Sequence, residues 1–425
     1  MIARALSIVA AALASGAAAS QLHAANWAYR SPLSHMPSLG HDVYSIAKRD
    51  AATLSYSGNV TFPWGIASGD AEPDSIILWT HPIAAEGSPS SICLRYQVST
   101  SADKFDKKSI VDEGEAKTTP DVDYSLKVES KGLKANTQYY YRFTGCGKSI
   151  GKYTSPVGAF KTLPKAHDKK YNSAKLGVFS CSNYPEGYFV AYQTAADSDI
   201  DYWVHLGDYI YEKASNKPAA AGRIPQPTHE IVTLDDYRLR YKTYHNDTGL
   251  RALRAQKAGY PIPDDHEVAD NTWKHGSADS NDTASGTIDG VNFTNRKKNA
   301  ILAYHEWQPI RGHPSDSQFN IYRSFTFGTL FDLPLWDTRQ SERDITDVYY
   351  NTAEIAKIKD QENRTLQGYS QEAWAFANVK NRKAQWSIIG QQIVMNQIIE
   401  LQGGDPDLDL DAWDGYTAGE CFLYR

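Results

Sequence analysis

The chain contains few of the residues that define several large protein classes. Only 4 of its 425 residues are cysteine and only 3 are methionine, and so few cysteines cannot build a disulfide-based scaffold. The 44 Lys and Arg residues are outnumbered by 50 Asp and Glu residues, which gives a formal net charge of −6. Because long basic runs are also absent, no nucleic-acid-binding surface is expected. Beyond the N-terminus, no segment approaches the roughly 20 apolar residues of a membrane helix, so no transmembrane segment is expected.

What the chain does contain is enough apolar and aromatic material for a large core. Its residues are 41% hydrophobic and 12% aromatic, and they include 27 tyrosines. A chain of 425 residues is too long for one ordinary core, so two domains are expected. The short basic runs Lys169-Lys170 and Arg296-Lys297-Lys298 are interpreted as solvated faces.

The N-terminus has the pattern of a secretory signal peptide. Arg4 supplies a positive charge, residues 6–14 form a short apolar stretch, and Ala17, Ala18 and Ala19 offer a small-residue cleavage site. We therefore predict a signal peptide over residues 1–19, an N-terminal arm over 20–57 and a secreted, extracellular protein.

The cysteines and the glycosylation sequons fit this location. Cys93 and Cys146 lie in one β-rich region and could pair, whereas the sequence leaves the partners of Cys181 and Cys421 open. In a secreted eukaryotic chain some Asn-x-Ser/Thr sites would carry glycans. Five such sites occur, at Asn59, Asn246, Asn281, Asn292 and Asn363.

Residues 58–163 show short strands separated by turn residues. Strands are expected at 75–80, 91–99 and 137–144, which is typical of an immunoglobulin- or fibronectin-like β-sandwich. Residues 139–141, three consecutive tyrosines, are interpreted as core residues that include a tyrosine-corner hydrogen bond. The polar segment 164–173 is predicted to be a linker.

Residues 174–425 alternate between strands and helices, which indicates an α/β domain. A buried strand is expected at 175–182, and residues 270–298, rich in Asn, Asp, Ser, Gly and Thr, are predicted to be a long loop near the binding site. The other expected elements are strands at 202–206, 325–336 (a pair) and 385–392, and helices at 188–196, 234–244 and 300–307.

Three segments that follow strands carry groups able to bind metals. They are Ser180-Cys181-Ser182, Gly207-Asp208-Tyr209-Ile210-Tyr211 and Asp264-Asp265-His266-Glu267. Each has a structural alternative: a buried cysteine, a solvated strand end and an acidic helix start. The order of thiolate, carboxylate with phenolate, then carboxylate with histidine favours a metal site, because ligands of α/β sheets bind at the carboxyl ends of strands.

This order resembles that of the PhoD-like alkaline phosphatases in the calcineurin-like metallophosphoesterase superfamily, from about residue 60 to the end of the chain. The resemblance implies an α/β metallophosphoesterase β-sandwich flanked by helices, preceded by the all-β sandwich. The matching blocks also include Phe62-Pro-Trp-Gly-Ile-Ala-Ser-Gly-Asp-Ala, Ile77-Leu-Trp-Thr, Asp236-Tyr-Arg-Leu-Arg-Tyr, Tyr322-Arg-Ser-Phe-Thr-Phe-Gly, Asp337-Thr-Arg-Gln and Asp411-Ala-Trp-Asp-Gly-Tyr.

The resemblance also implies roles for five residues. Cys181 and Tyr211 would bind Fe³⁺, and Asp208 would bridge it to Ca²⁺. Asp265 would be a ligand of the second metal, and His266 would protonate the leaving group or steady the transition state. Thiolate and phenolate suit Fe³⁺, Ca²⁺ takes oxygen ligands, and two cations can activate water for phosphoryl transfer. The expected activity is hydrolysis of phosphate monoesters or diesters at alkaline pH.

Two features depart from the family pattern. Pro263 stands where the family usually has a bulky residue, and proline cannot donate to a sheet ladder. The superfamily's late Gly-Asp-x-His segment is also absent, since the Gly-Asp pairs at 69–70, 207–208 and 404–405 lack a following x-His. We therefore expect an incomplete C-terminus in the phosphoesterase domain.

Two alternatives follow from these departures. One is a catalytically incomplete secreted glycoprotein that uses its β-sandwich for binding. The other is a purple-acid-type phosphatase, but that family has an aspartate where this chain has Cys181. Nothing in the sequence distinguishes phospholipid, nucleotide and polyol phosphates as substrates, or indicates the oligomeric state.

Overall fold

The computed structural model describes residues 56, 58–147, 153–214, 222–311, 321–396 and 408–417. The predicted signal peptide, nearly all of the N-terminal arm, and Cys421 lie outside these residues. No described helix is long and apolar enough to cross a membrane.

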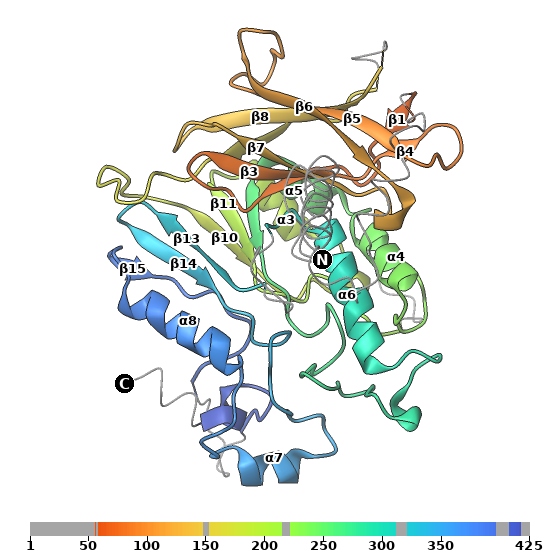
Figure 1. Ribbon diagram of the computed structural model, residues 1–425, viewed down its shortest axis with the longest axis vertical. Helices are drawn as coiled ribbons and strands as arrows, with labels where there is room; N and C mark the ends of the chain where they lie inside the picture. The colour runs from red at the N-terminus through yellow and green to blue at the C-terminus, as the bar shows by residue number, and fades with distance from the viewer. Residues whose placement is uncertain are drawn as a thin grey trace, which may run out of the picture.

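The N-terminal region forms a β-sandwich, as predicted. Its outer layer is an antiparallel sheet in the order β6-β5-β8-β9, at the top of Figure 1. Tyr139 and Tyr141 are buried, and the Tyr139 hydroxyl accepts a hydrogen bond from the Lys134 backbone N–H at 2.9 Å. The tyrosine-corner prediction is therefore confirmed, whereas the core prediction was wrong for Tyr140, which is only partly buried. These strands are β5 (Ile92–Ser99), β6 (Ile110–Thr118), β8 (Gln138–Gly145) and β9 (Gly158–Lys161), with the short pair β1 (Val60–Thr61) and β4 (Ile83–Ala84) beside them.

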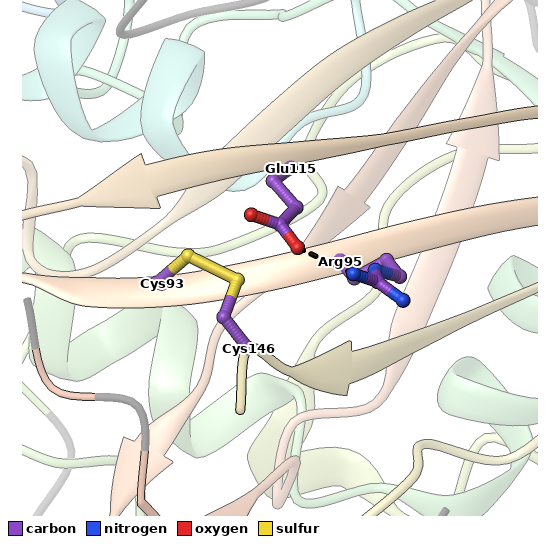
Figure 2. Close-up of a disulfide and its surroundings, with 4 residues drawn as sticks. All are labelled: Cys93, Arg95, Glu115 and Cys146. Carbon is purple, nitrogen blue, oxygen red and sulfur yellow. Dashed lines mark hydrogen bonds and ion pairs between the residues drawn. A yellow bond between two sulfur atoms is a disulfide. The ribbon is translucent and has the colours of Figure 1, made fainter. Parts of the chain in front are cut away.

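A disulfide joins two neighbouring strands of this outer sheet (Figure 2). Cys93 on β5 is bonded to Cys146, which directly follows β8, and Arg95 pairs with Glu115 across β5 and β6 at 2.6 Å. The bond closes a sequence separation of 53 residues, which in the chain-entropy model is worth about 4 kcal/mol. The pairing that the sequence left open is thus present, and Cys181 is the free cysteine of the described residues.

The second layer of the sandwich continues into the sheet of the C-terminal region. This sheet has the order β10-β11-β12-β2-β3-β7; β10, β11, β12 and β2 run parallel, and β2, β3 and β7 are antiparallel. Its strands are β2 (Ile66–Gly69), β3 (Ser75–Thr80), β7 (Leu126–Lys131), β10 (Leu176–Phe179), β11 (Tyr202–His205) and β12 (Ala258–Pro261).

The two regions meet where Gly69 of β2 pairs with Gly259 of β12. A Cβ atom on Gly69 would lie 2.7 Å from the Gly259 carbonyl oxygen, and one on Gly259 would lie 2.3 Å from the Trp203 ring. Both positions therefore require glycine for the strands to approach this closely. One hydrogen-bonded sheet thus contains strands from both sides of the polar segment 164–173. The sequence did not predict this continuity.

Helices flank this mixed sheet. α3 packs against α5, and α4 packs against α6. The helix starts are specified locally, since Thr233, Asp247 and Asn292 each accept a backbone N–H from the first turn of α4, α5 and α6. The helices are α3 (Val190–Asp197), α4 (Leu234–Tyr244), α5 (Thr248–Gln256) and α6 (Phe293–Trp307).

A three-stranded sheet and two helices complete the described chain. β13 and β14 are antiparallel, and β15 adds to β14 in parallel. In Figure 1 α8 lies below this sheet and α7 at the bottom of the molecule. These elements are β13 (Arg323–Phe327), β14 (Phe331–Leu335), β15 (Trp386–Ser387), α7 (Thr352–Ile358) and α8 (Tyr369–Lys380).

Three sequence predictions were wrong in this region. β10 is an edge strand and not a buried one, with Val178 60% exposed. Residues 293–298 belong to α6 and not to a loop. Arg296 and Lys297 are buried and not solvated, because the charge of Arg296 is met by Glu230 and its other donors by Tyr237 and Ser280.

Candidate active site

The three predicted metal-binding segments follow the parallel strands β10, β11 and β12. Parallel pairing brings their carboxyl ends to one edge of the sheet. The first two segments are hydrogen-bonded to each other, since the N–H groups of Cys181 and Ser182 donate to the carbonyls of Gly207 and Asp208 at 3.1 and 2.8 Å.

Both strand ends adopt a left-handed backbone. The φ angles are 56° at Cys181 and 54° at Asp208, a conformation that non-glycine residues rarely adopt and that is often found at functional sites. Gly207 has φ 99°, and a Cβ there would lie 2.3 Å from the backbone nitrogen of Asp264. Glycine at position 207 therefore allows the second and third segments to touch.

All five predicted site residues come together at this edge. Ligand atoms of Asp208, Asp265 and His266 lie within 4.8 Å of one another. The Tyr211 hydroxyl donates to the Asp208 carboxylate at 3.0 Å and is close enough to the Cys181 thiol for each group to shift the other's pKa. Asp208 thus lies between a sulfur–phenol pair and a carboxylate–imidazole pair.

The electrostatics of Asp208 fit a cation. Burial and the neighbouring charges of Asp264 and Asp265 raise the pKa of Asp208 to about 9, and its Oδ1 atom is buried without a hydrogen-bond partner. Burial also raises the pKa of Cys181 and holds that of Tyr211 well above its usual range. A bound cation would reverse each of these shifts, because it stabilises the deprotonated forms. The donor set therefore suits a metal site.

His266 is held in place by its Nδ1 atom. Nδ1 lies 2.6 Å from the buried Glu212 carboxylate, and the ring packs on Tyr211 with centroids 4.4 Å apart. Burial lowers the pKa of His266, but the hydrogen bond and the charge of Glu212 outweigh it and raise the pKa to about 11. Glu212 therefore favours the protonated form of the histidine, and the Nε2 atom is the one left to act as a proton donor.

Glu267 connects the second and third segments. Its carboxylate accepts hydrogen bonds from the backbone N–H groups of Asp208, Tyr209 and Asp264 at 3.1, 2.5 and 2.7 Å. Glu267 belongs to the third predicted metal-binding segment, but the sequence predicted no role for it. Pro263 does not disturb the arrangement, because β12 ends at Pro261 and no ladder bond is lost.

Two blocks from later in the chain also reach the site. Arg339, which is buried, donates to Asp264 and to Asp411, both at 2.6 Å, and lies 3.9 Å from Asp265. The Gln340 amide donates to the Asp264 carbonyl at 2.9 Å. Arg339 and Asp411 belong to sequence blocks that match the family pattern. That match was the only sign in the sequence that they lie at the candidate active site.

Comparisons with known proteins agree with this geometry. Residues 176–425 match the family model of the PhoD-like phosphatases, and residues 48–164 match that of the PhoD-like phosphatase N-terminal domain. The chain belongs to the PhoD-like phosphatase family. It is 34% identical over 368 residues to alkaline phosphatase D of Bacillus subtilis (strain 168), covering 84% of this chain and 60% of that protein. It therefore spans less than two thirds of the length of this curated relative.

A solved structure also matches the fold. The structure of PhoD matches with a TM-score of 0.72 and 31% identity, over 87% of this chain and 69% of that chain. The fold prediction, a metallophosphoesterase α/β domain preceded by a β-sandwich, is thus confirmed. Purple acid phosphatase PPD1 from yellow lupin (Lupinus luteus) seeds gives a TM-score of 0.39 and 12% identity, over 73% of this chain and 49% of that chain.

Proposed function

We propose that this protein is a metal-dependent phosphoesterase that hydrolyses phosphate monoesters or diesters at alkaline pH. The observation that carries the proposal is the environment of Asp208. This buried carboxylate lies beside Tyr211, Asp265 and His266, and its Oδ1 atom has no hydrogen-bond partner. Buried charges are normally paired or bound to metal. Membership of the PhoD-like phosphatase family supports the same reaction class.

The residues divide between two cations by their chemistry. Cys181, Tyr211 and Asp208 would hold Fe³⁺, whereas Asp208 and Asp265 offer the oxygen ligands that Ca²⁺ prefers. When bound, two such cations supply an activated water and stabilise charge on the transferring phosphoryl group. Thiol and phenol must lose their protons to bind, which favours loading at alkaline pH.

His266 is placed to serve the leaving group. Glu212 fixes its Nδ1 atom, so Nε2 would donate its proton to the departing oxygen of the ester. Glu267 holds the backbone of Asp208 and Asp264 in register, while Arg339 neutralises Asp264 and leaves Asp208 without an arginine partner. These residues orient the site before any substrate arrives.

We also propose that the protein is secreted, on the basis of the N-terminal pattern over residues 1–19. Two of the sequon asparagines, Asn246 and Asn363, are exposed in the structure and would be accessible to glycosylation. Mass spectrometry of protein collected from the medium of a eukaryotic host would test both points. Unglycosylated protein that keeps residues 1–19 would contradict them.

The test of the metal proposal is elemental analysis together with the visible spectrum. We expect iron and calcium to be bound, and a phenolate-to-iron charge-transfer band that disappears in Tyr211→Phe. The exposed Tyr350 provides a matched control, because Tyr350→Phe should leave the band unchanged. Phosphate release from phenyl phosphate measures the activity. A chain that binds no metal and releases no phosphate would instead support the alternative of a secreted binding glycoprotein.

A further inference from the structure

A second polar group lies beside His266, and the reaction described above does not use it. Asp270 is buried, and its Oδ1 atom lies 4.0 Å from the Nε2 atom of His266. Its carboxylate pairs with the Lys213 ammonium at 2.5 Å and accepts a hydrogen bond from the Tyr349 hydroxyl, which is 3.2 Å from both oxygens. No motif in the sequence pointed to any of these three residues.

Tyr349 is held in a conformation that is unfavourable for tyrosine. Its φ angle is 71°, in the left-handed region, and such strain persists only where the surroundings impose it. Burial does not explain it, because Tyr349 is 68% exposed. The loop is instead fixed by Asp347, which accepts the Tyr349 N–H at 2.7 Å and, through its carbonyl, the Asn271 amide at 2.8 Å.

Asn271 connects this loop directly to the metal-binding segment. Its backbone N–H donates to the Asp265 carboxylate at 2.7 Å. The position of Tyr349 is therefore tied to that of Asp265 through Asn271 and Asp347. Burial and the charge of Asp270 raise the pKa of Tyr349 to about 12, so the phenol still donates to Asp270 at alkaline pH.

Lys213 presents its charge outward. Its side chain is 51% exposed, and among the described residues the recorded acceptor of its ammonium is Asp270. An ammonium carries three donors, so two remain for a ligand or for water. The Lys213 ammonium neutralises Asp270, and the Tyr349 hydroxyl adds a hydrogen bond. Beyond His266 a ligand would therefore meet the half-exposed ammonium of this ion pair and an exposed aromatic ring.

We propose that Lys213 and Tyr349 form a leaving-group subsite that favours phosphate esters whose leaving group carries a negative charge. The ammonium of Lys213 would pair with that charge, and the ring of Tyr349 would pack against the adjoining part of the leaving group. The inference rests on the proposed function, because His266 defines the leaving-group side of the site.

The test compares two non-hydrolysable ligands, benzylphosphonate and 4-carboxybenzylphosphonate, which differ only in the negatively charged carboxylate on the ring. Calorimetry on the metal-loaded chain at low salt should give binding about two- to fivefold tighter for the carboxylated ligand, as a partly exposed ion pair allows. The preference should vanish in Lys213→Met and shrink at about 0.5 M salt. Equal binding of both ligands, or binding of neither, would overturn the proposal.

A matched control is available on the same molecule. Lys274 is a 40% exposed lysine that pairs with Asp344 at 2.6 Å and contacts none of the proposed site residues. Lys274→Met removes the same charge from a similar pair and should leave the preference unchanged. If Lys274→Met abolishes the preference as well, the effect arises from net charge, and the subsite is disproved.

Tyr349 is tested by separating its ring from its hydroxyl. Tyr349→Phe keeps the ring and should bind both ligands within about twofold of wild type, whereas Tyr349→Ala should weaken both by about three- to tenfold, because aromatic contact is lost. A thermal midpoint that does not fall in Tyr349→Ala shows that the tyrosine is not there for stability. A fall in the midpoint with unchanged binding would contradict the proposal.

Phenyl phosphate separates this inference from the proposed function. A chain that releases phosphate from phenyl phosphate but shows no ligand preference lacks the subsite and keeps the activity. A chain that shows the preference, lost in Lys213→Met, but never releases phosphate has the subsite and lacks the proposed activity.

Discussion

Two Gly-Asp pairs in this protein lie at the ends of strands in the same sheet, but their aspartates have different partners. Gly69-Asp70 ends β2 and Gly207-Asp208 follows β11, and both aspartates are buried with left-handed φ angles of 45° and 54°. Asp70 is met by arginines: Arg323 contacts both of its oxygens at 2.9 to 3.1 Å, and the Arg311 backbone N–H donates to it at 2.7 Å. Among the described residues Asp208 has no arginine or lysine partner; the charge of His266 acts on it, but it also lies against the carboxylates of Asp264 and Asp265.

The comparison shows that local sequence sets the conformation of a strand end but not its chemistry. In both pairs glycine permits the close approach of another chain segment, and the aspartate turns inward. What differs is the compensation of charge. A carboxylate already neutralised by arginine has no capacity left for a cation, so Asp70 ties β2 to β13, whereas Asp208 keeps a buried Oδ1 atom without a hydrogen-bond partner that is available to a metal.

The largest contrast is expected in activity. Asp208→Asn should lower phosphate release from phenyl phosphate by about 10³-fold or more, because a ligand shared by both proposed cations is lost, and several kcal/mol of transition-state stabilisation depend on them. Steady-state kinetics at saturating metal measure the effect. Asp70→Asn is the control, and its activity per folded molecule should remain within a fewfold of wild type. Retained activity in Asp208→Asn would refute the metal role.

The second contrast is expected in stability. Asp70→Asn should destabilise the fold by about 3 kcal/mol, since it leaves the partly buried Arg323 without its charged partner. Urea denaturation monitored by tryptophan fluorescence measures the change. In the metal-free chain, Asp208→Asn should not lose stability, because it removes repulsion. Equal losses in the two variants would mean that the two aspartates are compensated alike.

The third and smallest contrast is expected in pH dependence. The pKa of Asp208 is raised to about 9 from an ordinary 3.8, so between these pH values the metal-free folded chain holds a proton that the unfolded chain has released. Its free energy of unfolding should therefore fall as pH rises from about 4 to 9, by at most about 1.4 kcal/mol per unit from this group.

Thermal unfolding of the metal-free chain across this range measures the slope. Asp208→Asn should flatten it, and added metal should remove it by favouring the deprotonated carboxylate. A slope that is unchanged in Asp208→Asn would show that another group is responsible.

The strand ends could be predicted from the sequence. Whether the aspartate at a strand end is paired with arginine, as Asp70 is, or not, as in Asp208, could not. Hydrophobic runs followed by Gly-Asp predict where a carboxylate turns, and the residues after β10, β11 and β12 were placed together correctly. The partners of Asp70 were not predictable, because Arg311 and Arg323 lie 241 and 253 residues away in the chain. Periodicity carries no information about contacts at that separation.

The same limit explains the buried basic residues. Arg296 lies in a run that resembles a solvated helix face, and only the fold brings Glu230 and Ser280 against it. Glu267 was missed for a different reason. It contacts backbone N–H groups, which every residue has, so no complementary side chain in the sequence points to it.

The pairing of Gly69 with Gly259 has a practical consequence for anyone dividing this protein. The boundary between the two family-model matches, at residues 164 and 176, is a natural place to cut the gene. A cut there would leave β12 on one fragment and β2 on the other, each with an open strand edge that is normally paired. Exposed edges of this kind promote self-association. The two halves are therefore better expressed together, and a separated half is expected to be insoluble without its counterpart.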